Sequence, residues 1–452
     1  MARSAEPPLS TGHAAEPRGG ESRSASDRAR AVTEPPPLSE RTLGRTRGAD
    51  ADDAPVLVRT RHHEVVLYPE PMPLFEALER AIGRARERVW LETYIYRDDA
   101  MGAAFAALLA RAAARGVDVR LLYDPQGSRG TSRAFFRSLA ATGVAVRAYR
   151  PFRLARKRWT YWPRDHGRNV VVDDTAYTGG INWGIEWWPR ELGGEGWHDV
   201  SVGLRGPCVL DFMRVFEMRW EEASRVDCIS DHASPPTATD VELIADSPAS
   251  RSIIVERLCA QVRAARRRVW IENAYCIPPI VLLDALTHAA RRGVDVRLLM
   301  PAETDLPIIR TITRGEYAEW LRRGLSVSEF QGRVMHSKFA VVDDDWATVG
   351  TFNAMTPGIW WANETNVIVH DRRFADELAR VFERDTARSI AITHGWTRQR
   401  PVYRRLWERF AAGLYRLVER TLMPVRRALR GRSLRRYALP SPASEPASIT
   451  GE

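Results

Sequence analysis

The sequence predicts an α/β protein whose two halves are similar, and three repeated blocks carry this prediction. The segment Arg115–Leu122 reads RGVDVRLL, and Arg292–Leu299 repeats it residue for residue. Upstream, RERVWLETYI corresponds to RRRVWIENAY, and downstream the triplet RVF occurs in both halves. Because the three blocks recur in the same order, we interpret the chain as an internal duplication.

Each copy alternates between helical and strand-forming segments. A helix precedes an apolar strand, a second helix follows, and a glycine turn leads into the strands VDVRLLY and VDVRLLM. Alternation of this kind predicts sheets with helices on their faces. The chain of 452 residues is long enough for two domains of ordinary size.

The expected domain boundaries follow from composition. Residues 1–54 are rich in Ala, Ser, Pro, Arg and Glu, and we expect this segment to be disordered. The first domain is expected over residues 55–226 and the second over residues 227–395, because the sequence between them has turn composition without periodicity. Residues 396–452 are expected to form a basic amphipathic tail.

Composition also narrows the classes of function. The four cysteines show no CxxC pairing, which gives no support to a zinc site or a redox dithiol, and we expect neither a metal nor a cofactor. The N-terminal residues lack the apolar core of a signal peptide, and no apolar stretch is long enough to cross a bilayer. A membrane role would therefore be peripheral, and we expect it at the cytoplasmic face of the inner (plasma) membrane.

The basic charge is concentrated in the tail. Residues 396–437 hold 13 Arg and two acids and carry +11; since the whole chain carries +10, the remainder carries −1. Apolar positions in this tail recur every three or four residues, as on one face of a helix: Leu406, Trp407, Phe410, Leu414, Leu417, Val418, Thr421 and Val425. Between them lie Arg404, Arg405, Arg409, Arg416 and Arg420.

A basic amphipathic helix of this kind is typical of segments that lie on anionic membranes. The alternative is a helix packed on the body of the protein with a solvated arginine face. If the tail only docks the protein, its removal after about residue 395 should release the protein from anionic vesicles and spare the activity of the upstream domains on a soluble substrate.

One motif occurs in both halves and brings together groups that suit a phosphate. The second half contains His336, Lys338, Asp343, the pair Gly350-Thr351, and Asn353. The first half contains His166, Arg168, Asp173, the pair Gly179-Gly180, and Asn182. Residues two apart in a strand point to the same side, so each histidine should lie beside its cation. Glycine at the following corner lets the backbone approach a bound group, so an imidazole, a cation and a carboxamide converge.

These residues resemble the phospholipase D superfamily, whose signature is HxKx4Dx6G(S/T)xN. The second half fits it throughout, whereas the first has Arg168 in place of lysine and lacks one residue before its glycine pair. A wider resemblance over residues 56–395 points to bacterial cardiolipin synthases, through LETYIYRDDAMG, TGGINWG, WHDVSVGLRGPCVLDF and HSKFAVVDDDWATVGTFN. The resemblance implies two pseudo-twofold-related phospholipase D-like α/β sandwich domains with the active site at their interface.

The resemblance also implies roles for the residues of both motifs. His166 would attack phosphorus and form a phosphohistidine, and His336 would protonate the departing alcohol and then deprotonate the incoming one. The non-bridging oxygens would be held by Lys338, Arg168, Asn182 and Asn353. The downstream acids Asp199 and Glu364 would orient the histidines.

Asp173 and Asp343 belong to the catalytic motif of the family. Their positions directly after an apolar strand favour a turn carboxylate over a proton carrier.

The predicted function is phosphatidyl transfer between anionic phospholipids, with a phosphatidylglycerol-like donor and acceptor. One alternative is a phospholipase D-type hydrolase acting on lipid or nucleic acid, and another is a non-catalytic membrane-binding homologue. The near-neutral body argues against nucleic acid, because a nuclease would favour a basic groove. The intact second motif argues against loss of catalysis. Transfer and hydrolysis stay open, because they differ only in which hydroxyl arrives second.

Overall fold

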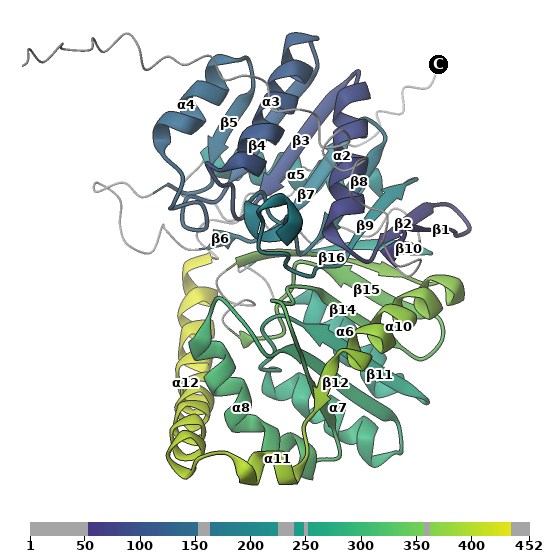
Figure 1. Ribbon diagram of the computed structural model, residues 1–452, viewed down its shortest axis with the longest axis vertical. Coiled ribbons are helices and arrows are strands. Elements are labelled where there is room, and N and C mark those ends of the chain that lie inside the picture. Colours follow the sequence, from purple (N-terminus) through teal and green to yellow (C-terminus); the bar gives the residue numbers. More distant parts are fainter. Residues whose placement is uncertain (1–52, 152–162, 225–238, 248–251, 357–361, 435–452) are drawn as a thin grey trace, which may run out of the picture.

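The computed structural model describes residues 53–151, 163–224, 239–247, 252–356 and 362–434, and side chains of the last helix through Thr421. The segment predicted to be disordered, residues 1–54, lies outside these ranges except for its last two residues. Two α/β domains lie one above the other in Figure 1. The predicted fold class is confirmed.

The first domain contains an eight-stranded sheet with helices on both faces. Its strands, in spatial order, are β1 (Val56–Arg59), β2 (Glu64–Tyr68), β9 (Ser201–Arg205), β8 (Thr175–Gly179), β7 (Asn169–Val172), β3 (Arg88–Thr93), β4 (Asp118–Tyr123) and β5 (Ala145–Ala148). Its helices are α2 (Pro71–Arg84), α3 (Ala100–Ala114), α4 (Arg133–Ala141) and α5 (Val209–Ser224), with the short 3-10 turns η4 (Ile185–Trp187) and η5 (Arg190–Leu192).

The second domain repeats this arrangement. Its strands, in spatial order, are β10 (Val241–Asp246), β16 (Ala362–Val369), β15 (Trp346–Gly350), β14 (Lys338–Val342), β11 (Arg268–Asn273), β12 (Asp295–Pro301), β13 (Ser326–Phe330) and β17 (Ser389–Ala391). Its helices are α6 (Ile253–Ala264), α7 (Ile280–Arg291), α8 (Pro307–Arg322), α10 (Arg372–Ala387), α11 (His394–Gln399) and α12 (Val402–Leu434). Strand β6 (Arg164–Asp165) comes from the first half and pairs with β16.

The strand order confirms the duplication. The order β2-β9-β8-β7-β3-β4-β5 in the first sheet matches β10-β16-β15-β14-β11-β12-β13 in the second. The repeated block also makes the same contact twice: the Trp90 indole donates to Asp118, and the Trp270 indole donates to Asp295, at 2.9 and 3.0 Å. Repeated sequence therefore forms repeated tertiary structure, down to single hydrogen bonds.

Three large hydrophobic clusters hold the two sheets and their helices together. One lies between the first sheet and helices α2, α3 and α4, and another between the second sheet and helices α6, α7 and α8. The third contains residues of both sheets together with α5 and α10. Because this third cluster is continuous across the halves, the junction between the domains is part of the hydrophobic core.

Helix α12 runs beside α8 along one side of the second domain (Figure 1). Ala411 and Ala412 are buried together with Ile277 and Ile312, so small side chains allow the two helices to approach closely. In the described part of the chain, no helix is both long and apolar enough to span a bilayer.

Candidate active site

Two short backbone pairings join the halves beside the predicted catalytic histidines. The His166 amide donates to the carbonyl of Asn363 at 3.0 Å, next to the parallel pairing of β6 with β16. The His336 amide donates to the carbonyl of His198 at 2.7 Å, beside an isolated bridge between His198 and Met335. In both cases the accepting residue directly precedes a predicted orienting acid, so each histidine is brought to an acid of the other half.

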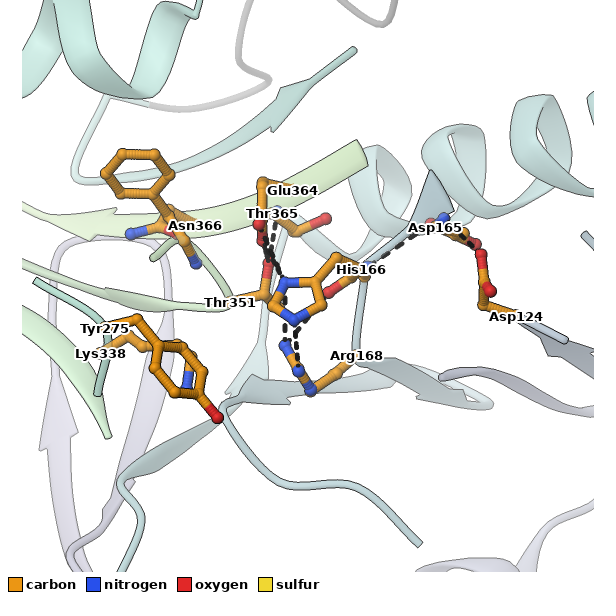
Figure 2. A network of polar contacts seen from close by, with 12 residues as sticks. Asp124, Asp165, His166, Arg168, Tyr275, Lys338, Thr351, Glu364, Thr365 and Asn366 are labelled. Atoms are coloured by element: carbon orange, nitrogen blue, oxygen red, sulfur yellow. Dashed lines mark hydrogen bonds and ion pairs between the residues drawn. The ribbon is translucent and has the colours of Figure 1, made fainter. Parts of the chain in front are cut away.

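The side chains of the two histidines then contact the acids of the opposite half. His166 Nδ1 lies 2.9 Å from Glu364 Oε1, and His336 Nδ1 lies 3.0 Å from Asp199 Oδ2. Figure 2 shows His166 between Glu364 and the guanidinium of Arg168. Each histidine therefore contacts an acid of the opposite domain through Nδ1, which directs its Nε2 toward the cation of its own motif.

A cation accompanies each histidine, as the two-residue spacing predicts. Arg168 Nη2 lies 2.7 Å from His166 Nε2, and Lys338 Nζ lies 3.1 and 3.2 Å from the two ring nitrogens of His336. Both cations are buried, and within the described ranges neither forms an ion pair with a carboxylate. Two buried positive charges without a paired carboxylate are suited to an anionic ligand such as a phosphodiester.

The two asparagines differ in how their amides are held. Asn182 accepts hydrogen bonds from Arg168 Nε and from the Ile95 amide, both at 3.0 Å. Its buried Nδ2 has no partner among the described residues, and neither has Oδ1 of the buried Asn353. An unsatisfied buried polar group costs about 1–3 kcal/mol, which a ligand that forms the missing bond would recover. The Asn182 amide is therefore a donor available to a phosphoryl oxygen.

Burial shifts the protonation of this site strongly. Burial and the neighbouring cations Arg168 and Lys338 hold the pKa of His166 well below its ordinary value. Burial, followed by Lys338, lowers the pKa of His336 to about 4, and burial lowers the pKa of Lys338 to about 7. Burial raises the pKa of Glu364 to about 8. At neutral pH both imidazoles are thus uncharged in the free site, as a nucleophile requires.

The motif aspartates lie away from this chemistry, at the opposite end of the strands that begin beside the histidines. Asp173 accepts from the backbone amides of residues 86, 87 and 88, and Asp343 accepts from those of residues 266, 267 and 268. Both residues have positive φ angles, 49° and 51°. These contacts favour the turn-carboxylate interpretation, because each carboxylate fixes a neighbouring loop and touches neither histidine.

Sequence reasoning missed the groups that hold the two acids. Thr351, at the second position of the Gly-Thr pair, donates its hydroxyl to Glu364. The first half has Gly180 at this position, where a Cβ would lie 2.3 Å from Asp199 Oδ1. There the donor is the indole of Trp187, whose Nε1 lies 3.0 Å from Asp199 Oδ2. The replacement of threonine by a second glycine was the only sequence signal of this difference.

Aromatic side chains also surround the histidines. Trp187, Trp197 and Tyr275 lie with ring centroids 5.4, 5.6 and 5.9 Å from His336. Tyr94 lies 4.9 Å from His166. The two half-sites are therefore unequal, with His336 the more enclosed of the two.

A second buried polar group lies at the domain junction. His198 Nε2 is 2.9 Å from Asp385 and 3.6 Å from Glu272. One nitrogen or oxygen atom of each of the three residues lies within 4.8 Å of the other two, a spacing that could hold a metal ion. Arg384 pairs with Asp385, and Ser337 donates to Glu272. His198 and Arg384 together satisfy both oxygens of Asp385, whereas Oε2 of Glu272 has no partner among the described residues; because the group joins residues of both halves, we assign it to the structure of the junction.

Comparison with known proteins identifies the family. The family described as "Cardiolipin synthase, PLD-like domain" matches residues 78–192 and 258–386, so it matches both halves. The chain belongs to the phospholipase D-like cardiolipin synthases. The predicted family is thereby confirmed, and with it the enzyme class, a phospholipase D-type phosphatidyltransferase.

Two curated members of this family illustrate the similarity. Cardiolipin synthase B of Escherichia coli (strain K12) is 36% identical over 317 residues, which cover 67% of this chain and 76% of that protein. The cardiolipin synthase of Listeria innocua is 28% identical over 369 residues, covering 80% and 76% of the two chains. These alignments extend well beyond the histidine motifs.

Solved structures share the fold at much lower identity. The phosphatidylserine synthase of Haemophilus influenzae Rd KW20 matches 84% of this cardiolipin synthase-family chain and 97% of its own, with a TM-score of 0.63 and 11% identity. The polyphosphate kinase of Porphyromonas gingivalis matches 78% of this chain and 53% of its own, with a TM-score of 0.52 and 13% identity. Both similarities bear on the architecture of the two-domain scaffold.

Proposed function

We propose that this chain transfers a phosphatidyl group between anionic phospholipids, with a phosphatidylglycerol-like donor and acceptor. The observation that carries the proposal is the pair of crossed histidine–acid contacts, His166 with Glu364 and His336 with Asp199, beside Arg168. A nucleophile, an acid and a charge clamp are the groups that displacement at a phosphodiester needs. Membership of the cardiolipin synthase family supports lipid as the substrate class.

The proposed first step is attack by His166 Nε2 on phosphorus. The phosphorus–oxygen bond to the departing alcohol breaks, and that alcohol takes a proton from His336, which takes up this proton when the negative charge of the bound phosphodiester raises its pKa. Lys338, Arg168 and the Asn182 amide bind the non-bridging oxygens as negative charge develops. The product of this step is a phosphatidyl group on His166 and a neutral His336.

The proposed second step reverses the first. His336 removes the proton from the hydroxyl of the acceptor lipid, which attacks phosphorus and releases His166. Water in place of the acceptor would give hydrolysis instead. Transfer is favoured by the enclosure of His336 among Trp187, Trp197 and Tyr275, because aromatic walls limit the access of water.

The proposed membrane contact is the outer face of α12. Its large apolar side chains are exposed instead of covered by the protein: Val402, Tyr403, Leu406, Trp407, Phe410, Leu414, Leu417 and Val418, with exposed fractions from 37% to 68%. The helix therefore packs on the body, as the alternative interpretation held, but its apolar row is exposed together with several of its arginines. Such a row is suited to the acyl boundary of a bilayer.

The arginines of α12 divide between the two faces. Arg404, Arg409 and Arg420 are exposed, whereas Arg416 is paired with Glu316 and Glu419 of the protein. Arg416 is therefore not one of the exposed basic residues of this helix. Each remaining basic residue near an anionic surface contributes roughly 1 kcal/mol. This arrangement supports peripheral binding at the cytoplasmic face of the inner (plasma) membrane, the proposed site of action.

The proposal is tested by incubating the purified protein with vesicles of phosphatidylglycerol and analysing the lipid products by mass spectrometry. Diphosphatidylglycerol together with released glycerol is the expected result, and phosphatidic acid alone would show hydrolysis. His166→Ala and His336→Ala should each abolish turnover, and the intermediate should label His166 in a His336 variant. Labelling of His336 alone would reverse the two roles.

A further inference from the structure

Helix α12 has a second face, which turns toward the catalytic domain. Glu408, Ala411, Ala412 and Glu419 are buried there, although the large apolar residues of the same helix are exposed. The approach to α8 is close, since a Cβ on Gly315 would lie 2.2 Å from the carbonyl oxygen of Glu408. This buried face is polar at both ends, so its acids need partners in the body.

The partners of the C-terminal end of this face lie at the ends of two loops of the catalytic domain, one that leads into the first residue of α7 and one that follows β15. Glu419 Oε1 accepts from the Thr356 hydroxyl at 2.7 Å and from the Ile280 amide at 3.2 Å. Tyr415 Oη accepts from the Thr356 amide at 3.1 Å. Arg416 donates to Glu419 Oε2 at 2.7 Å and so completes the coordination of this carboxylate. One buried carboxylate therefore ties two loops to the helix.

Both loops lead directly to the active site. Thr356 lies three residues after Asn353, which the motif predicts to bind phosphate, and the Ala354 amide between them donates to Asn273 Oδ1 at 3.1 Å. The same Asn273 oxygen accepts from the amide of Tyr275 at 3.2 Å. The Tyr275 ring lies against His336, as described above, so these hydrogen bonds connect Glu419 to the second half-site in a few steps.

We propose that Glu419 is a positioning residue, which fixes Asn353 and Tyr275 through its bonds to Thr356 and Ile280. The helix that carries the exposed apolar row thus also sets the geometry of the second half-site. Only the membrane contact of this helix rests on the proposed function. The positioning of Asn353 and Tyr275 rests on the hydrogen bonds alone. The expectation that the tail can be removed without loss of chemistry is revised accordingly.

Glu408 offers a matched control on the same helix. It is 7% exposed, against 9% for Glu419, and it forms an ion pair with Arg400. It lies 11 residues earlier, about 16 Å along the helix axis. A purely structural effect of losing a buried acid should therefore appear in both variants, whereas a positioning effect should appear only at Glu419.

The experiment compares Glu419→Leu with Glu408→Leu in the full chain, because leucine removes the accepting oxygen that glutamine would keep. For each variant kcat and KM are measured on bis(p-nitrophenyl) phosphate, together with the melting temperature and flotation with phosphatidylglycerol vesicles. We expect kcat of E419L to fall about tenfold or more with vesicle flotation retained, because displacement of catalytic groups by about 1 Å can cost a hundredfold. We expect kcat of E408L to stay within about twofold of the wild type.

A second pair of variants covers the case in which E419L fails to fold. Thr356→Ser keeps the hydroxyl that donates to Glu419 and should retain kcat, whereas Thr356→Val should reproduce the loss of kcat. Wild-type kcat in E419L, or equal losses in E419L and E408L, would overturn the inference. If the wild type neither binds vesicles nor forms lipid product while E419L still lowers kcat, the proposed function fails and the positioning role stands.

Discussion

The indole of Trp187 should govern how well His336 acts as an acid. Its N–H and the imidazole of His336 both contact Oδ2 of Asp199, each at 3.0 Å, while Oδ1 accepts from the Val200 amide at 2.9 Å. Trp187→Phe keeps an aromatic ring in this position and removes the N–H. Asp199 would then be free to rotate away from His336, because one of its three hydrogen-bond donors is lost.

The size of the effect follows from the strength of a hydrogen bond to a charged group, about 1.5–3 kcal/mol. Since each 1.4 kcal/mol in the barrier is tenfold in rate, kcat should fall by about tenfold to 150-fold. The assay compares two soluble phosphodiesters, one with a nitrophenol and one with an alkyl alcohol as the leaving group. Nitrophenol departs without a proton, so its release in the first turnover should remain within about threefold of the wild type.

The rate measured for the alkyl ester tests whether Trp187 acts through the proton transfer by His336. Its release needs a proton from His336, so the first turnover of W187F should slow by the full factor. Equal slowing of both esters would contradict the reasoning, because a general loss of structure affects both leaving groups. A melting temperature close to that of the wild type serves as the control for folding.

Three further predictions concern the cations and metal dependence. Arg168→Lys should retain most activity and Arg168→Ala should lose at least about tenfold in kcat/KM, since the clamp needs a charge beside His166; a fully active alanine variant would contradict this. Because burial lowers the pKa of Lys338 to about 7, kcat/KM should fall as the pH rises through 7 and the ammonium loses its proton. Lys338→Arg should shift that decline to higher pH, and an unchanged profile would assign it to another group. Activity should persist in chelator; full loss that one added metal restores would show a metal requirement.

The duplication and the motifs could be predicted because both are local patterns. The repeated RGVDVRLL block fixes one strand and its glycine turn, and the two-residue spacing places Arg168 beside His166 and Lys338 beside His336. The pairing of each histidine with an acid of the other half could not be predicted in this way. Glu364 is 198 residues from His166 in sequence, and its contact depends on β6 of one half pairing with β16 of the other. No periodicity within one half reports such a pairing.

The partners of α12 within the protein could not be read from its sequence for a different reason. Helical spacing identifies an apolar face and a mixed face, and burial of the apolar face is the usual outcome. Here the contact with α8 uses Ala411 and Ala412, because small side chains allow a close approach, and Glu419 finds its partners in loops far away in sequence. Those loop partners become visible only when the tertiary structure is known.

The inequality of the two half-sites supports the division of roles between the histidines. His166 has a side chain 12% exposed and shares its acid with a rotatable threonine hydroxyl, whereas His336 is 5% exposed and its acid is held by the fixed N–H of an indole. A nucleophile must move toward phosphorus and carry a bulky phosphatidyl group, which requires space. A proton donor and acceptor must instead stay aligned through two successive transfers, which requires rigidity. The more open His166 fits the first task and the enclosed His336 fits the second. At Asp199, the acid that pairs with His336, Gly180 offers no hydroxyl and the N–H of Trp187 takes its place. This fixed donor matches the rigidity that a proton donor and acceptor needs.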